Sequence, residues 1–189
     1  MGFLKNVFGR TEPPKANLDN LFAVPSAAIT LEVAAGFKPT GVASVCYRAA
    51  EGGAFTSTQT DVQVLLDADG GPPIERTTDD FGFTWLVCRR DPGELPELIT
   101  DVHAVNSSLE NAGFGPSLLC SMVAFTDESD RRLGLIYLYK QGTFYPFAPK
   151  TDKQRDNALE LQIRGVLTDD VTVEPELGRW MAVWGAPGL

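Results

Sequence analysis

The stretch from residue 94 to residue 140 constrains the fold of this chain more than any other. Apolar residues recur there at steps of three and four, which places them on one stripe of an α-helix: Leu95, Leu98, Val102, Val105, Leu109 and Ala112. Gly113 and Pro116 stop this helix. The apolar runs Leu118 to Phe125 and Leu133 to Tyr139 then predict two strands joined by a polar turn. The stretch therefore predicts an antiparallel hairpin covered by a helix.

A similar order of elements is predicted upstream. A helical face that includes Val62 and Leu66 ends at a pair of glycines, and strands over Ile74–Thr77 and Phe83–Arg90 follow. This order allows two related helix-hairpin units, although convergence on a common motif explains it equally well. With a further strand over Val42–Arg48, the sequence predicts an α+β fold. We expect a mainly antiparallel sheet of five or six strands, with helices packed chiefly on one face.

The first 16 residues read as an amphipathic arm followed by a proline linker, and residues 17–189 read as a single α+β domain. Four residues of the arm form a compact apolar face: Phe3, Leu4, Val7 and Phe8. This face predicts weak contact with a membrane surface or a partner, while docking on the chain's own domain or fraying is the alternative. Nothing in the arm resembles a signal peptide, and we expect no run of about 18 apolar residues that could span a membrane.

Short helices are predicted from Asn17 and from Ser26, the latter ending at Gly36. Pro146 restricts the segment Thr143 to Phe147 to a sheet edge or a loop. Thr151 and Gln154 have the spacing of a capping box, which predicts a helix from Asp152 to about Leu167. We expect the tail, Glu176 to Leu189, to pack across the body because it carries Trp180 and Trp184.

Composition indicates an ordinary globular chain, with 43% hydrophobic and 22% charged residues. The net charge of −9 disfavours binding to nucleic acid, because the field of the whole molecule repels phosphate. Cys46, Cys88 and Cys120 each lie in a predicted apolar strand and have no C-x-x-C spacing. We expect buried, reduced thiols of a cytoplasmic protein.

The sequence offers no convincing catalytic set, metal site or cofactor site. His103 is the only histidine, so a Ser-His-Asp or Cys-His arrangement would have to use it, but no nucleophile motif accompanies it. The glycines around Phe114 lack the lysine of a phosphate-binding loop. Paired aspartates occur in or beside turns, where Asp is common for backbone bonding. We therefore predict a chain that is not an enzyme and holds no metal or cofactor.

Two groups of residues remain as candidates for binding. The first is a cationic patch for a ligand, formed by Arg89, Arg90 and Arg155 with Lys140, although a solvated rim explains these residues as well. The second is an aromatic cluster that would bind a partner, with a lid over the core as the alternative. Its members are Tyr137, Tyr139, Lys140, Phe144, Tyr145 and Phe147.

Several long strings of this sequence resemble the PspA-associated protein family called PspAB. They are MGFLKNVFGRTEPPKANLDNLFAVPSAAITLE, ITDVHAVNSSLENAGFGPSLLCSMVAF, YLYKQGTFYPFAP, RDNALELQIRGVL and WGAPGL. The resemblance runs the length of the chain. It implies an actinobacterial protein encoded beside PspA, a coiled-coil protein of the membrane-stress response, and it carries no assigned catalytic residues.

These observations lead to three functional hypotheses. The first is a non-enzymatic cytoplasmic adaptor of a PspA-type envelope-stress or phage-shock response, which binds PspA or another stress-response protein. The second is an accessory protein attached to the inner face of the membrane through the amphipathic arm. The third and weakest is a small-molecule enzyme with a pocket framed by Arg89, Arg90 and Lys140. A homodimer through an open sheet edge is a further hypothesis.

Overall fold

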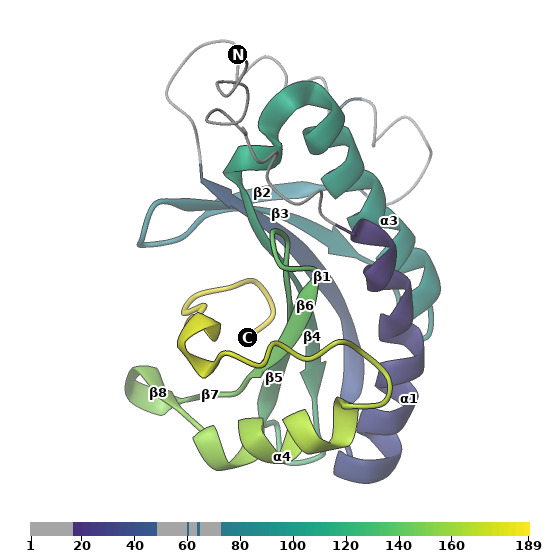
Figure 1. Cartoon of the computed structure of the whole chain (residues 1–189), viewed down its shortest axis with the longest axis vertical. Helices are drawn as coiled ribbons and strands as arrows, with labels where there is room; N and C mark the ends of the chain where they lie inside the picture. Colours follow the sequence, from purple (N-terminus) through teal and green to yellow (C-terminus); the bar gives the residue numbers. More distant parts are fainter. Residues whose placement is uncertain (1–16, 49–59, 61–63, 65–72) are drawn as a thin grey trace, which may run out of the picture.

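The fold is a curved six-stranded sheet with helices on one of its faces (Figure 1). This computed structural model describes residues 17–48, 60, 64 and 73–189. Every strand pair in the sheet is antiparallel, and the strand order is β2-β3-β1-β4-β5-β6. The predicted α+β class, the antiparallel sheet and the strand number are therefore confirmed.

The sheet strands are β1 (Lys38–Arg48), β2 (Glu75–Thr78), β3 (Phe83–Arg89), β4 (Leu118–Thr126), β5 (Arg132–Leu138) and β6 (Thr143–Phe147). Two short strands, β7 (Pro149–Lys150) and β8 (Gln154–Arg155), form a separate pair. The helices are α1 (Val24–Ala35), α3 (Leu95–Leu109) and α4 (Asn157–Leu167). Shorter 3₁₀ or π turns cover Leu18–Ala23, Glu110–Phe114, Gly115–Ser117, Thr151–Lys153 and Leu177–Arg179.

Strand β1 lies near the middle of the sheet and pairs with β3 on one side and β4 on the other. Its pairing with β4 shifts register between Pro39 and Ala43. Gly41 lies at this irregularity with φ of +78°, and a Cβ at this position would meet the Arg90 carbonyl oxygen at 2.1 Å. Only glycine therefore lets the start of β1 bend this closely against the chain that follows β3.

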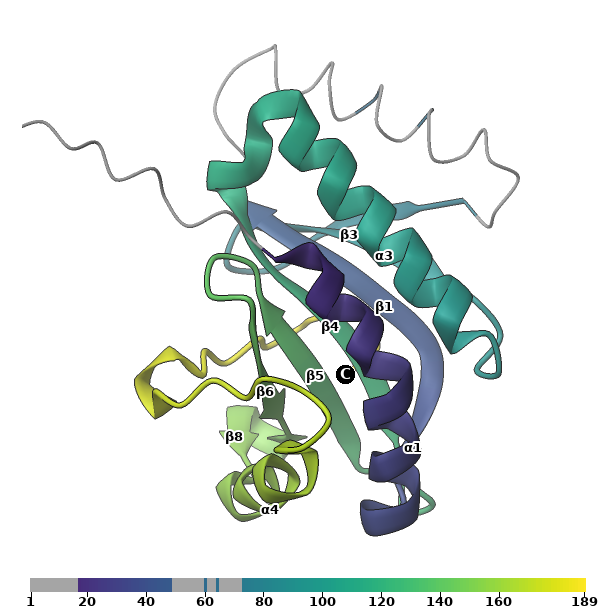
Figure 2. The same cartoon turned by 45° about the vertical axis from the view of Figure 1, so that its right-hand side comes forward.

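The helical layer, α1 and α3, covers one face of the sheet (Figure 2). The apolar stripe predicted for α3 is confirmed, and Leu98, Val102 and Val105 are fully buried. Ala112 is an exception because the helix ends at Leu109, which leaves this alanine exposed in the following turn. Ile99, which the stripe did not include, is buried beside Leu98.

Helix α1 begins at Val24, two residues before the predicted cap at Ser26. The Ser26 hydroxyl instead donates to the Asp170 carboxylate at 3.3 Å. Gly36 ends α1 as predicted, with φ of +75°. The helical run Leu18–Ala35 has a mean hydropathy of 1.2 and is long and apolar enough to cross a membrane by length and composition alone. The expectation that no run approaches this length was therefore wrong.

Helix α4 begins at Asn157, so the predicted capping box at Thr151 and Gln154 is wrong. The cap is Asp156, whose carboxylate accepts a hydrogen bond from the Leu159 amide at 3.1 Å. Thr151 belongs to a single 3₁₀ turn, and Gln154 to β8.

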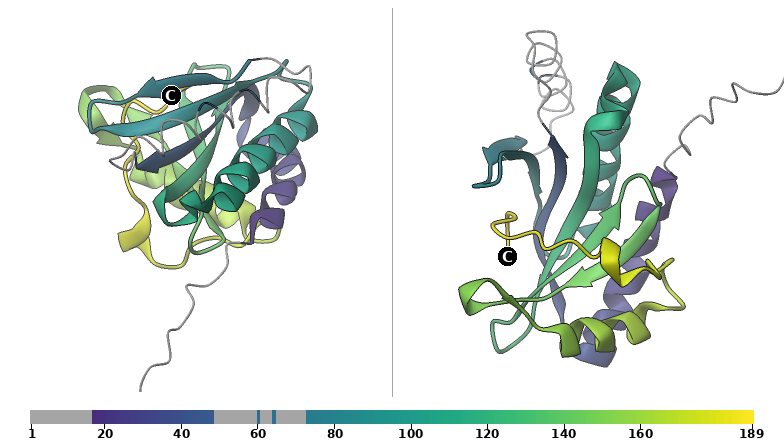
Figure 3. Two further views of the ribbon diagram at one scale, coloured as in Figure 1. Left: turned by 90° about the horizontal axis from the view of Figure 1, so that it is seen from above. Right: turned by 60° about the vertical axis from the view of Figure 1, so that its left-hand side comes forward.

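The C-terminal tail crosses the sheet face opposite the helical layer (Figure 3). The Trp180 ring stacks on Tyr145 with ring centroids 5.8 Å apart, and the Trp184 ring meets Phe147 edge-on at 5.0 Å. The prediction that the tail packs across the body is confirmed.

The two sheet edges differ. Strand β6 is an edge strand, as Pro146 predicted, and the tail covers it because the Phe144 amide donates to Thr172 and the Glu174 amide donates to Phe144. At the other edge, no strand among the described residues pairs with the outer side of β2. The dimer hypothesis stays a prediction. The predicted arm and the helix through Val62 and Leu66 lie outside the described residues, Thr60 and Val64 excepted, so the arm, its boundary and the duplication also stay predictions.

Candidate functional site

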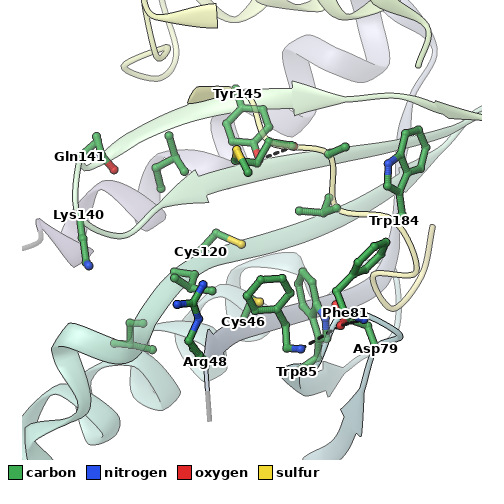
Figure 4. Close-up of a pocket in the computed structure, with 17 residues that line it drawn as sticks. Cys46, Arg48, Asp79, Phe81, Trp85, Cys120, Lys140, Gln141, Tyr145 and Trp184 are labelled. Atoms are coloured by element: carbon green, nitrogen blue, oxygen red, sulfur yellow. Dashed lines mark hydrogen bonds between the residues drawn. The ribbon is translucent and has the colours of Figure 1, made fainter. Parts of the chain in front are cut away.

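A cleft of about 560 Å³ lies on the tail-covered face of the sheet (Figure 4). Its floor comes from β1, β3 and β4, one wall from the turn between β2 and β3, and the opposite wall from β5, β6 and the tail. The cleft lies in the range of volumes typical of small-molecule sites. Its lining includes Cys46, Phe81, Phe83, Trp85, Leu119, Cys120, Leu138, Tyr145, Met181, Val183 and Trp184.

Most polar groups along the cleft already have partners within the protein. The Asp79 carboxylate accepts hydrogen bonds from the amides of Phe81 and Phe83, each at 2.9 Å, and from the Trp85 indole at 2.9 Å. The Tyr145 hydroxyl donates to the Met181 carbonyl at 2.9 Å. These groups hold the two walls in place and leave an apolar interior.

Positive charge gathers at one end of the cleft. Figure 4 shows Arg48 and Lys140 toward one end, and Trp184 with Phe81 toward the other. Both cationic side chains are exposed, and Arg48 lies over the Phe83 ring at 5.8 Å. In the part of the chain that the structure describes, neither forms an ion pair with a carboxylate. This end can therefore attract an anion on a molecule of net charge −9.

The thiols in the cleft floor do not have the environment of a nucleophile. Cys46 and Cys120 lie directly opposite each other on β1 and β4, and both are buried and free of disulfides. A hydrogen bond with Cys120, together with burial, raises the pKa of the Cys46 thiol far above its ordinary value. Cys88, on the other face, is also a free, buried thiol, and burial raises its pKa to about 12. The expectation of buried, unpaired thiols is confirmed.

The aromatic cluster predicted as an exposed partner surface lies in the core. Tyr137, Tyr139 and Phe144 pack in the core beneath the helical layer, whereas Tyr145 and Phe147 face the tail, and all five are buried. The expectation of an exposed aromatic face was wrong because both faces of β5 and β6 are covered, and the burial agrees with the alternative, a lid over the core. Only Lys140 of the predicted group is exposed, at the rim of the cleft.

The predicted cationic patch does not form, because each arginine pairs with its own carboxylate. Arg89 contacts Glu75 at 3.2 Å, Arg90 contacts Asp101 at 2.7 Å, and Arg155 contacts Glu160 at 2.9 Å. Arg89 lies opposite Val42 in the β1–β3 pair, at the far end from Arg48, and none of the three arginines lines the cleft. The prediction of a pocket framed by Arg89, Arg90 and Lys140 was therefore wrong. Of these three residues, only Lys140 lines the cleft.

His103 lies on the helical face of the molecule, away from the cleft. Its Nε2 is 3.4 Å from an Asp19 carboxylate oxygen, and its Nδ1 is 3.4 Å from the Ser107 hydroxyl. Its ring also packs 4.8 Å from Phe22. None of these residues lines the cleft, and the Asp19 side chain is 83% exposed. We interpret this set as surface packing between α3 and the turn before α1.

A second candidate surface is the outward face of α1 and the turn before it. Phe22, Ile29 and Val33 lie at helical spacing on one stripe, which we call the α1 stripe, and their exposed fractions are 49%, 67% and 83%. The opposite side of the helix is buried through Val24, Ala27 and Leu31. The stripe is therefore apolar surface that the core does not use.

A model of one protein family matches residues 1–188. That family is PspAB, described as PspA associated protein B. The chain belongs to this family. The family name indicates an association with PspA, and it supports a PspA-related accessory role. No curated protein and no solved structure matches the chain.

Spacing in the sequence of this PspAB-family chain predicted little of the cleft. Arg48 lies two residues after Cys46 on β1, so the sequence predicts that their side chains point to the same face of the sheet. Their approach to Asp79, Trp85 and the tail depends on strand register, which spacing alone does not reveal. Within the described ranges, no group of three His, Cys, Asp or Glu side chains is placed to hold a metal ion.

Proposed function

We propose that this chain is a non-enzymatic cytoplasmic accessory protein that binds PspA through the α1 stripe. The observation that carries the proposal is the apolar stripe on a chain whose family is named for association with PspA. Exposed apolar side chains that share one face of a helix mark an interaction site more often than scattered ones do.

The stripe provides a useful amount of binding energy. Complete burial of a Val, Ile or Phe side chain contributes about 1.5–3 kcal/mol, so burying the exposed parts of Phe22, Ile29 and Val33 contributes roughly 3–6 kcal/mol. This gain must exceed the entropy lost on association, so neighbouring polar contacts are also required. The stripe alone therefore fits a modest, regulated interaction.

The shape and charge of the surface favour a helical partner. Ile29 and Val33 are four residues apart on α1 and so share one face, which Phe22 extends from the preceding 3₁₀ turn. A ridge of this kind packs along a helix or into a groove between helices. Asp19, which contacts His103, and Asp170, which accepts from Ser26, place carboxylates beside the ridge, and Glu32 next to Val33 is paired with Lys38. A helix of PspA, which the resemblance describes as a coiled-coil protein, would bind there through apolar residues with Lys or Arg beside them.

Substitutions on the stripe test this proposal. Ile29→Glu and Val33→Glu each place a charge in the apolar contact, so we expect at least a tenfold loss of affinity for purified PspA, measured by isothermal titration calorimetry. Leu177→Glu is the matched control because Leu177 is 53% exposed and lies on the tail. Circular dichroism should show all three variants folded. Full-strength binding by both stripe variants would disprove this surface.

Membrane attachment through Phe3, Leu4, Val7 and Phe8 is a separate prediction, because these residues lie outside the described part of the chain. Liposome flotation tests it independently of PspA. Attachment through the arm requires that Phe8→Glu reduces flotation, and unchanged flotation would exclude it.

A further inference from the structure

We propose that the cleft binds a single-chain amphiphile with an anionic head, of the long-chain carboxylate class. The alkyl chain would lie along the apolar floor toward Trp184, and the carboxylate would lie at the end marked by Arg48 and Lys140 (Figure 4). This site is separate from the α1 stripe, because the cleft opens on the opposite face of the sheet.

The interior of the cleft suits an alkyl chain better than a peptide. A peptide brings an amide and a carbonyl at nearly every residue, and each needs a partner when it is removed from water. The backbone groups of the floor strands already hydrogen-bond to one another, because β1 pairs with β3 on one side and with β4 on the other. Asp79 and Tyr145 are likewise committed to partners within the protein. An alkyl chain has no such requirement and gains from every apolar wall.

The two ends of the cleft set the direction of the ligand. Trp184 and Phe81 line one end with aromatic rings, and the only carboxylate in the described lining, Asp79, is already hydrogen-bonded three times. Arg48 and Lys140 lie at the other end, where Gln141 adds a polar side chain. An anionic head is favoured there, and a cationic head is repelled.

Two ligands of equal chain length separate the contribution of the charge from that of the chain. We expect dodecanoate to bind more tightly than dodecanol in calorimetric titrations kept below the micellar concentration. Arg48→Ala and Lys140→Ala should each weaken dodecanoate about three- to fivefold while leaving dodecanol unchanged. Lys38→Ala is the control, because Lys38 pairs with Glu32 beside the α1 stripe. Equal affinity for both ligands, or equal loss in the control, would overturn the assignment of the head.

A second set of variants tests the location of the chain. Leu138→Glu places a carboxylate in a half-buried wall and should weaken dodecanoate at least tenfold. A brominated long-chain carboxylate quenches tryptophan on contact, so it should quench the protein's fluorescence, and Trp184→Phe should reduce the quenched fraction. Absence of dodecanoate binding to the unmodified chain would overturn the proposal, as would binding that Leu138→Glu does not change. Neither result bears on PspA binding.

Discussion

The two faces of the sheet are built from the same strands but are covered in different ways. On one face, α1 and α3 lie over the strands, and residues such as Leu98 and Val102 are fully buried. On the other face, an irregular tail is attached at a few points, chiefly Glu174, which accepts from Thr143, Trp180, which stacks on Tyr145, and Trp184, which meets Phe147. Regular helices pack side by side without gaps, whereas a tethered tail leaves space between its attachments. The helical face therefore supplies stability, and the tail face supplies the cleft.

The largest expected effect is on the helical face. Leu98→Ala leaves a cavity beneath α3, so we expect a loss of about 2–5 kcal/mol in the free energy of unfolding, measured by urea denaturation. Leu161→Ala is the control because Leu161 is half exposed on the outer side of α4, and its loss should stay below about 1 kcal/mol. Similar losses for both variants would show that the helical layer is not the stabilising one.

A smaller effect is expected on the tail face. Trp184→Ala removes a half-buried ring and its edge-on contact with Phe147, so we expect a loss of about 1–3 kcal/mol in the free energy of unfolding. Under conditions in which both variants are folded, Trp184→Ala should change the affinity of the cleft for dodecanoate more strongly than Leu98→Ala does. A loss of stability larger than that of Leu98→Ala would reverse the comparison of the two faces.

The tether at Glu174 predicts a dependence on pH. Burial alone would raise the pKa of the Glu174 carboxyl, but hydrogen bonds from Thr143 and the Glu176 amide, with the charge of Arg179, hold it below its ordinary value of 4.5. The folded state therefore gains stability from this carboxylate above about pH 4.5 and loses that stability as the pH falls through the lowered pKa.

This pH effect is the smallest of the set and is measured by urea denaturation at several pH values from 6 to 3. In the Glu174→Gln variant, the free energy of unfolding should fall less steeply as the pH is lowered from about 4.5 to 3. A mutant curve that runs parallel to that of the unmodified protein would show that other carboxylates account for the acid sensitivity. Asp127 and Asp156, whose pKa values are also lowered, provide the comparison.

Local patterns of the sequence predicted much of the fold and little of the site. The stripe of α3 and the hairpin of β4 and β5 depend on spacing within about 45 residues, so they were readable. The burial of Tyr145 and Phe147 could not be predicted from the sequence, because alternation along a strand assigns residues to two faces without showing whether each face is covered. The cleft joins residues as distant in sequence as Cys46 and Trp184, and only tertiary register brings them together.

The α1 stripe was missed for a different reason. Helical periodicity predicts which face of a helix turns inward, but it does not show whether the outward face is covered. Leu18–Ala35 is apolar around most of its circumference, although a single-layer cover needs only one apolar side. The mean hydropathy of 1.2 over Leu18–Ala35, in a chain of net charge −9, was the feature of the sequence that could have indicated an apolar outward face.

Photo-crosslinking from the α1 stripe tests the proposed function most directly. A photoreactive amino acid replaces Val33 in one variant and Leu177 in a second, and each variant is irradiated with PspA in solution. The proposal predicts a crosslink to PspA from position 33 and little or none from position 177. Crosslinking that is equal at the two positions, or that occurs at position 177 alone, would contradict binding through the outward face of α1.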